Sequence, residues 1–369
     1  MRICFLHKPY DSYILSRSKY LVENGHEVYS IYFDSKKMGA HSSVGWCGSI
    51  SLGRSSTLYV KYLNRFLFSH KIAQFTRKHD IDIFHVNGML NSFYFPFSCA
   101  KKQVIENQGS DVIRTADLYP VFKLLYRFFY RFVDGVIQDS EIAQIKGLKL
   151  GAPVENNEII EIGVDFCVFN PDVEYGKARK NLGLTENEKM VLSSRGLKDL
   201  YNLDILLKTI PIVMESVREV KFVFASHDSG FMKKYATLIN ELGVEDYVFL
   251  AGQLDHTETM PYFCKDADVV ISVPSSDSSP ASVYEAMACK TPAIVSDLPW
   301  FQGKLEKDRD MITVPVRNIE KLAEAIITVL NGERAVDVDL AYHKVYNNIN
   351  FQTENSKLET YYAKILADS

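Results

Sequence analysis

Two carboxylates eight residues apart are the clearest chemical feature of this 369-residue chain. Asp277 lies in a loop rich in serine and proline, and Glu285 lies in the helical stretch that follows it. Carboxylate oxygens accept hydrogen bonds well from neighbouring pairs of hydroxyls, such as those of a ribose or a hexose. The helix is predicted to begin near Pro280, with Ser278 or Ser279 as its N-cap. Free backbone N–H groups at such a helix start favour an anion such as a phosphate.

Two further loops carry groups that suit a phosphorylated ligand. Arg195 follows an apolar run at 190–194, with Lys198 close behind it. A guanidinium can hold phosphate oxygens through two parallel hydrogen bonds. Gly252 and Leu254 follow another apolar run, and glycine lets a ligand approach the backbone closely.

These loops need strands to position them, and the chain alternates short apolar runs with helical stretches throughout. In the first half, strands are predicted at 2–5, 27–32, 83–86, 103–106, 135–137 and 159–162. In the second half, strands are predicted at 190–194, 221–225, 247–250, 269–273, 293–295 and 311–314. Strands separated by helices indicate βαβ units in parallel sheets, so we expect an α/β protein with two doubly wound domains.

The run 277–289 and the segment 291–297 resemble the E-x7-E region of family 4 glycosyltransferases, with Asp277 in place of the first glutamate. These are retaining enzymes of the GT-B fold, so the resemblance implies two Rossmann-like domains that face a central cleft. It also implies that Glu285 holds the nucleotide ribose and that Asp277 contacts the donor sugar.

The same resemblance extends to the other donor-side loops. It implies that Arg195 binds the donor diphosphate, with Lys198 acting from a shifted place, and that the loop of Gly252 and Leu254 meets the base through its backbone. The helix start would complete the donor site with Ser278, Ser279, Ala281 and Ser282.

In the first half, Gln108 and Asp111 lie in a loop that resembles the family's H-G-x-D motif, with Gln108 in place of the histidine. The resemblance implies that Gln108 touches the donor sugar, and Asp111 caps a turn or faces the acceptor. The first loop of the chain, with Lys8 and Tyr10, is expected on the acceptor side. The segment 162–171 matches the family's junction between the two domains.

We therefore predict an N-terminal acceptor-binding domain at 1–168, a C-terminal nucleotide-sugar-binding domain at 186–349, and a final helix at 350–369 that packs back on the first domain. The implied function is metal-independent transfer of a sugar, from a UDP-sugar as the expected donor, to a hydroxyl of a glycan or lipid-linked acceptor in polysaccharide synthesis. The departing phosphate would help to take the acceptor proton. The alternatives are a non-catalytic nucleotide- or glycan-binding scaffold and a nucleotide-sugar epimerase.

Composition excludes other classes of protein. Apolar residues make up 47% and charged residues 24%, which is typical of folded globular proteins. No stretch approaches the roughly 20 apolar residues that a membrane-spanning helix needs. Net charge is -4, which does not favour nucleic acid. The D-x-D triplets lie in ordinary helix and loop segments, and we expect neither a cofactor nor a metal site. The six cysteines are expected to be reduced and mostly buried.

One segment suggests a membrane surface. Lys123, Arg127 and Arg131 recur at i, i+4 and i+8 on one helical face, among many apolar residues. A basic, aromatic helix can lie on an anionic bilayer, although a core helix with a solvated basic face fits the same pattern. We expect a cytoplasmic protein, with the inner face of the membrane as an alternative location.

Overall fold

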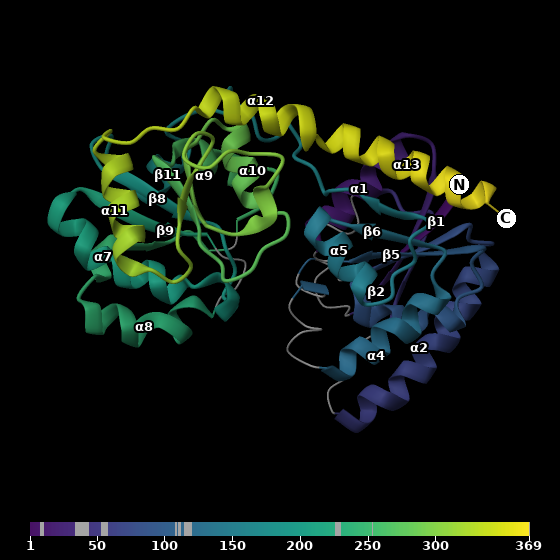
Figure 1. Cartoon of the computed structure of the whole chain (residues 1–369). Helices are drawn as coiled ribbons and strands as arrows, with labels where there is room; N and C mark the ends of the chain where they lie inside the picture. The colour runs from purple at the N-terminus through teal and green to yellow at the C-terminus, as the bar shows by residue number, and fades with distance from the viewer. Residues whose placement is uncertain are drawn as a thin grey trace. The chain divides into compact units, whose positions relative to one another are not determined.

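The chain forms two compact units, shown in Figure 1. The computed structural model describes residues 1–7, 11–33, 44–52, 58–107, 109, 112–113, 120–225, 230–252 and 254–368. Unit 1 is Met1–Ile162 with Gln352–Ser369, and unit 2 is Gly163–Phe351. The segment between the two predicted domains, 169–185, therefore lies in unit 2, where it includes α6 (Lys177–Leu182).

Unit 1 is built around one parallel sheet, which has seven strands in the described residues. Its strands are β1 (Arg2–His7), β2 (Glu27–Tyr32), β3 (Gly48–Ser51), β4 (Ile83–Asn87), β5 (Lys102–Asn107), β6 (Gly135–Gln138) and β7 (Asn157–Ile159). They lie in the order β3-β2-β1-β4-β5-β6-β7. The order reverses direction between β1 and β4, as it does in doubly wound folds.

Both faces of this sheet are buried, because side chains alternate along each strand. In β1, Cys4 and Leu6 join the core under α2 (Leu58–Lys78), α4 (Pro120–Phe129) and α5 (Glu141–Lys149). Ile3 and Phe5 join the core under α1 (Ser12–Glu23) and α13 (Phe351–Ala367). Gly25, which has a φ of 82°, follows α1 in the left-handed conformation that commonly ends a helix.

Unit 2 repeats the architecture with a six-stranded parallel sheet among its described residues, in the order β10-β9-β8-β11-β12-β13. The strands are β8 (Lys189–Ser193), β9 (Val220–Phe224), β10 (Val248–Leu250), β11 (Val269–Ser272), β12 (Ala293–Ser296) and β13 (Ile312–Val314). One face packs on α7 (Leu203–Ser216), α8 (Phe231–Leu242) and α11 (Ile319–Leu330). The other packs on α6, α9 (Met260–Asp266), α10 (Ala281–Ala288) and α12 (Val338–Asn348). The prediction of two doubly wound parallel sheets is confirmed.

Local structure departs from the predictions in several places. The strand predicted at 159–162 is β7, which ends at Ile159. The strand β3 and the helices α6 and α12 were not predicted. Three cysteines are exposed and three are buried, so the expectation that most would be buried is wrong.

The last helix, α13, packs on the sheet of unit 1, alongside α1 (Figure 1). Leu358, Tyr362 and Ile365 are fully buried in the core that it shares with β1. The Tyr361 hydroxyl lies 2.6 Å from the carbonyl oxygen of Asn156 and donates to it. The end of the chain thus completes the core of the unit in which the chain begins.

A buried polar network fixes α1 and α13 against the strands. Nη1 of Arg17 lies 2.6 Å from Oε2 of Glu106, and its Nε donates to Oδ1 of Asn355 at 3.2 Å. His85 lies 3.0 Å from the same carboxylate oxygen and 2.5 Å from the Tyr362 hydroxyl. Burial opposes ionisation of Glu106, but the charge of Arg17 and the contact with His85 outweigh it and lower the pKa of Glu106 to about 2.

Glu106→Ala is expected to lower the free energy of unfolding of unit 1 by about 3–5 kcal/mol, because it leaves Arg17 charged and buried without its partner. The two tryptophans of the chain are Trp46 in unit 1 and Trp300 in unit 2. Urea unfolding followed by fluorescence in a Trp300→Phe background therefore reports unit 1 alone.

Glu158→Gln is the matched control, because Glu158 forms a half-exposed ion pair with Lys364 at 3.2 Å. Such pairs contribute less than about 1 kcal/mol. Equal losses in the Glu106 and Glu158 variants would contradict the structural role assigned to the buried network.

Candidate functional site

The strand order of unit 2 defines where its ligand site should lie. The order reverses between β8 and β11, and loops that leave the carboxyl ends of two such strands flank a crevice. The loop after β8 carries Arg195, and the loop after β11 carries Asp277. Asn202 ties the loops together, because its Nδ2 donates to the carbonyl oxygen of Val273 at 2.9 Å.

Arg195 and Asp277 meet at this point. Nη2 of Arg195 lies 2.8 Å from Oδ2 of Asp277, and Nη1 donates to Oγ of Ser282 at 3.2 Å. The guanidinium also lies 4.3 Å from the centre of the Tyr201 ring, a cation–π distance. Only 12% of the Arg195 side chain and 14% of the Asp277 side chain are exposed. The structure thus joins two residues that the sequence assigned to different parts of a donor.

The guanidinium of Arg195 has more N–H groups than these two contacts use. Of its five N–H groups, the two contacts with Asp277 and Ser282 use one on each terminal nitrogen. The Nε–H of Arg195 is buried and has no partner among the described residues. This N–H group can therefore donate a hydrogen bond to a ligand.

The helix α10 begins beside this pair. The predicted N-cap, Ser278 or Ser279, is wrong: Pro280 is the N-cap, and within the described residues no side chain caps the helix. Instead, the backbone N–H of Ser278 donates to Oδ1 of Asp277 at 3.0 Å. The first turn of α10 is instead held by the backbone, since the N–H groups of Ala281 and Val283 donate to the carbonyl oxygens of Ser279 and Pro280. Ala281 and Ser282 are partly exposed in its first turn.

Glu285 lies one turn further along α10 and is largely buried. Its Oε1 lies 2.8 Å from Nε2 of His256, a residue that the sequence analysis did not single out. The His256 ring packs on Phe169, with 5.3 Å between ring centres. Burial lowers the pKa of His256, but the charge and hydrogen bond of Glu285 outweigh this effect and raise it overall.

The remaining donor-side residues lie on neighbouring loops. Gly252 has a φ of 71° and open space around the position of a Cβ, so a ligand has room to approach there. The Leu254 side chain is buried in the core of unit 2, which leaves only its backbone for a ligand. Lys198 is exposed before the short helix η5 (Asp199–Tyr201). Lys234 of α8 holds this loop by donating to the carbonyl oxygen of Leu197 at 2.6 Å.

The acceptor-side candidates Lys8, Tyr10 and Asp111 lie outside the described residues, as does Gln108, the candidate for contact with the donor sugar. Close to them, the backbone N–H of Gly109 donates to Oδ2 of Asp139 at 2.9 Å. At the predicted junction, Gly163 has a φ of 79°, and a Cβ there would lie 2.6 Å from the Cα of Phe351. A glycine is therefore required where the two chain segments cross.

The basic helix suggested by the sequence has an exposed apolar stripe. Lys123, Arg127 and Arg131 are exposed, while Tyr126 and Phe129 anchor α4 in the core. The stripe follows the i, i+3, i+4, i+7 spacing of one helix face. Its members and their exposures are Val121 (61%), Leu124 (68%), Leu125 (39%) and Phe128 (49%). Exposed apolar clusters of this kind mark interaction surfaces.

Aspartates of the D-x-D triplets form hydrogen bonds and ion pairs that stabilise the fold. Asp266 accepts hydrogen bonds from the backbone N–H groups of Gly176, Ala178 and Arg179 at the start of α6. Asp310 lies 2.7 Å from Nζ of Lys344. Across the described part of the chain, no group of three or more His, Cys, Asp or Glu side chains is arranged to hold a metal ion.

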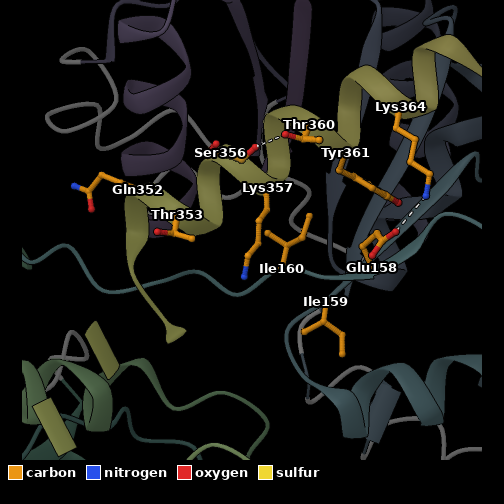
Figure 2. A pocket seen from close by; sticks show the side chains of 10 residues that line it. All are labelled: Glu158, Ile159, Ile160, Gln352, Thr353, Ser356, Lys357, Thr360, Tyr361 and Lys364. Atoms are coloured by element: carbon orange, nitrogen blue, oxygen red, sulfur yellow. Dashed lines mark hydrogen bonds and ion pairs between the residues drawn. The ribbon is translucent and has the colours of Figure 1, made fainter. Parts of the chain in front are cut away.

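Unit 1 also contains a groove of about 650 Å³ between β7 and α13 (Figure 2). Its lining residues are Glu158, Ile159, Ile160, Gln352, Thr353, Ser356, Lys357, Thr360, Tyr361 and Lys364. In Figure 2, Lys364 reaches from α13 to Glu158, and the two form an ion pair at 3.2 Å. Among the described residues, none of the donor-side candidates of unit 2 lines this groove.

Known proteins share parts of this sequence. Residues 175–348 match the family described as glycosyl transferases group 1. The alpha-monoglucosyldiacylglycerol synthase of Streptococcus pneumoniae is 29% identical over 185 residues, which are 49% of this chain and 41% of the synthase. The chain thus matches less than half of the length of that relative.

Known structures share the whole fold. The Anabaena protein Alr3699/HepE, solved in complex with UDP and glucose, has a TM-score of 0.81 and 16% identity over 100% of both chains. Sucrose-phosphate synthase from Thermosynechococcus elongatus has a TM-score of 0.82 and 16% identity, also over 100% of both chains. The chain therefore has the GT-B fold, and the part of it that matches the glycosyl transferases group 1 family, residues 175–348, lies in unit 2.

Proposed function

We propose that the chain is a retaining, metal-independent glycosyltransferase. It transfers a sugar from a nucleoside diphosphate-sugar, with UDP as the expected nucleotide, to a hydroxyl of a glycan or lipid-linked acceptor in polysaccharide or glycoconjugate synthesis. The observation that carries the proposal is the cluster of Arg195, Asp277 and the uncapped start of α10 at the carboxyl ends of β8 and β11. The group 1 family match and a structural neighbour with bound UDP support it.

The chemistry follows from the donors and acceptors of the cluster. The spare N–H groups of Arg195 and the first turn of α10 bind the diphosphate and stabilise its charge as it leaves. Asp277 accepts a hydrogen bond from the donor sugar, and Glu285 accepts hydrogen bonds from the ribose. Ser278, Ser279, Ala281 and Ser282 shape the phosphate end of the site. The backbone around Gly252 and Leu254 meets the base.

A non-catalytic nucleotide- or glycan-binding protein is the second candidate. The observation that favours it is the ion pair between Asp277 and Arg195, since a carboxylate held at 2.8 Å by a guanidinium has fewer lone pairs left for a sugar. A protein of this class binds the nucleotide but releases no UDP from a UDP-sugar when acceptors are supplied.

Glu285→Ala is expected to weaken UDP binding by roughly 10- to 100-fold, because hydrogen bonds to a charged group contribute roughly 1.5–3 kcal/mol. Isothermal titration of UDP, GDP, ADP and TDP in EDTA measures the affinity and identifies the base. Glu324→Ala is the control, because Glu324 forms an exposed pair with Lys321 on α11. If no nucleotide binds the wild-type chain, the proposed donor site is wrong.

The exposed surface of α4 suggests where the chain could contact a membrane that carries a lipid-linked acceptor. We propose that Lys123, Arg127 and Arg131, together with the stripe formed by Val121, Leu124, Leu125 and Phe128, contact an anionic lipid surface at the cytoplasmic face of a membrane. The stripe would enter the headgroup region while the basic side chains pair with lipid phosphates. In the residues described, no helix has the length and apolar content needed to cross a bilayer.

Leu124→Glu combined with Phe128→Glu is expected to reduce affinity for phosphatidylglycerol vesicles by more than about tenfold, because burying each side chain contributes roughly 1.5–3 kcal/mol. Co-sedimentation with vesicles measures this affinity. Ile212→Glu on α7 is the control, since Ile212 is an exposed apolar residue of unit 2. Equal binding to phosphatidylcholine alone would argue against the role of the basic residues. Self-association in ultracentrifugation without vesicle binding would identify a second copy of the chain as the partner.

A further inference from the structure

The Glu285 carboxylate is held by a residue from another part of unit 2. His256 belongs to the loop between β10 and α9, 29 residues before Glu285 in the chain. Its Nε2 lies 2.8 Å from Oε1 of Glu285, and the exposed fractions of the two side chains are 20% and 8%. The contact therefore forms in a largely dehydrated place, where a hydrogen bond is stronger than in water.

The backbone around His256 is rigidly built. The side chain of Asp255 accepts from the N–H groups of Thr257 at 2.9 Å and Glu258 at 2.8 Å. The backbone carbonyl oxygen of Asp255 accepts a hydrogen bond from the N–H of Met260, at the start of α9, at 2.9 Å. On the other side, the ring of Phe169 packs on the imidazole. The position of His256 is thus fixed before any ligand arrives.

A carboxylate with one fixed oxygen presents the other in a defined direction. A hydrogen bond from Nε2–H to Oε1 restricts rotation about the last bond of Glu285, which is otherwise soft. The carboxylate has about four lone-pair positions, so the remaining ones stay available for hydroxyls. Pre-orientation of this kind reduces the conformational entropy that binding must overcome.

We infer that His256 is a positioning residue that orients the Glu285 carboxylate toward the ribose hydroxyls of the nucleotide donor. The inference rests on the proposed function, since it assigns Glu285 to the ribose. It adds a residue outside the D-x7-E segment to the donor site. It also adds a dependence on pH, because the imidazole carries the proton that neutralises the pair.

The sign of the pH effect follows from the groups around the imidazole. Glu285 on α10, Asp255 on its own loop and Asp165 near Phe169 all favour the protonated ring, and together they outweigh burial, so the pKa of His256 is raised. Below that pKa, the pair with Glu285 is neutral. As pH rises through it, the site gains one negative charge, which repels the anionic diphosphate.

The test compares UDP with 2′,3′-dideoxy-UDP, which lacks the ribose hydroxyls. His256→Ala is expected to weaken UDP binding by roughly tenfold, the effect of one hydrogen bond, and to leave dideoxy-UDP binding nearly unchanged. His256→Gln retains an N–H near the position of Nε2, so it is expected to recover most of the UDP affinity. It should also lack the fall in affinity that is expected of the wild type as pH rises above about 6.5, the ordinary pKa of histidine.

The outcomes separate this inference from the proposed function. If neither UDP nor another nucleoside diphosphate binds the wild type, both are wrong. If Glu285→Ala weakens UDP binding while His256→Ala binds UDP as the wild type does, only the role of His256 is wrong. An equal loss for UDP and dideoxy-UDP indicates a merely structural histidine and overturns the inference. If His256→Ala does not fold, the pH profile of His256→Gln decides, and an unchanged profile overturns it.

Discussion

The reversal of strand order between β8 and β11 is the constraint on which the donor-side cluster depends. At such a reversal, the helices that follow the two strands lie on opposite faces of the sheet. No single helix therefore covers the loops that follow both strands. The space left at their carboxyl ends is where Arg195 and Asp277 meet, although 82 residues separate them in the chain. The buried strands fix the positions of the two loops, so the side chains of Arg195 and Asp277 lie close enough to form the pair.

Two acid–base pairs of different kinds share this end of unit 2. The guanidinium of Arg195 cannot be deprotonated in a protein, so it acts as a fixed group. The pair of His256 and Glu285 changes charge when the imidazole loses its proton. In the proposed function, the diphosphate end thus contains an ion pair without net charge, whereas the ribose end contains a pair whose charge depends on pH.

Much of this arrangement could be predicted from the sequence, because buried parallel strands appear as short apolar runs that end where the polar loops begin. Arg195, Asp277 and Glu285 follow such runs closely, and their elements lie where they were expected. The strand β3 was missed because Gly48–Ser51 contains a single large apolar residue. The N-cap at Pro280 was missed because serine is the better capping residue in isolation.

The role of His256 could not be predicted in the same way. A single histidine in a loop has no periodicity, and its contact with Glu285 depends on how α10 packs beside the loop that leads to α9. The outward stripe of α4 was also hidden, since the spacing of Leu124 and Phe128 is the same for a face turned to the core and a face turned to solvent. The burial of Tyr126 and Phe129 shows that the opposite face of α4 is the one turned to the core.

Arg17 and Arg195 each form an ion pair with a largely buried carboxylate, and a comparison of their surroundings shows how the two pairs differ. Arg17 uses all three nitrogens on partners within unit 1, namely Asn355, Glu106 and the carbonyl oxygen of Glu161. Every nitrogen of this guanidinium thus has a partner inside the core, and its location between α1, α13 and the sheet explains its structural role. Arg195 has the same kind of partner, but its buried Nε–H has none among the residues that the structure describes, and it lies in a loop rather than beneath a helix. Native structures rarely leave such donors unsatisfied, which is why the proposed function uses the Nε–H of Arg195 to bind the diphosphate.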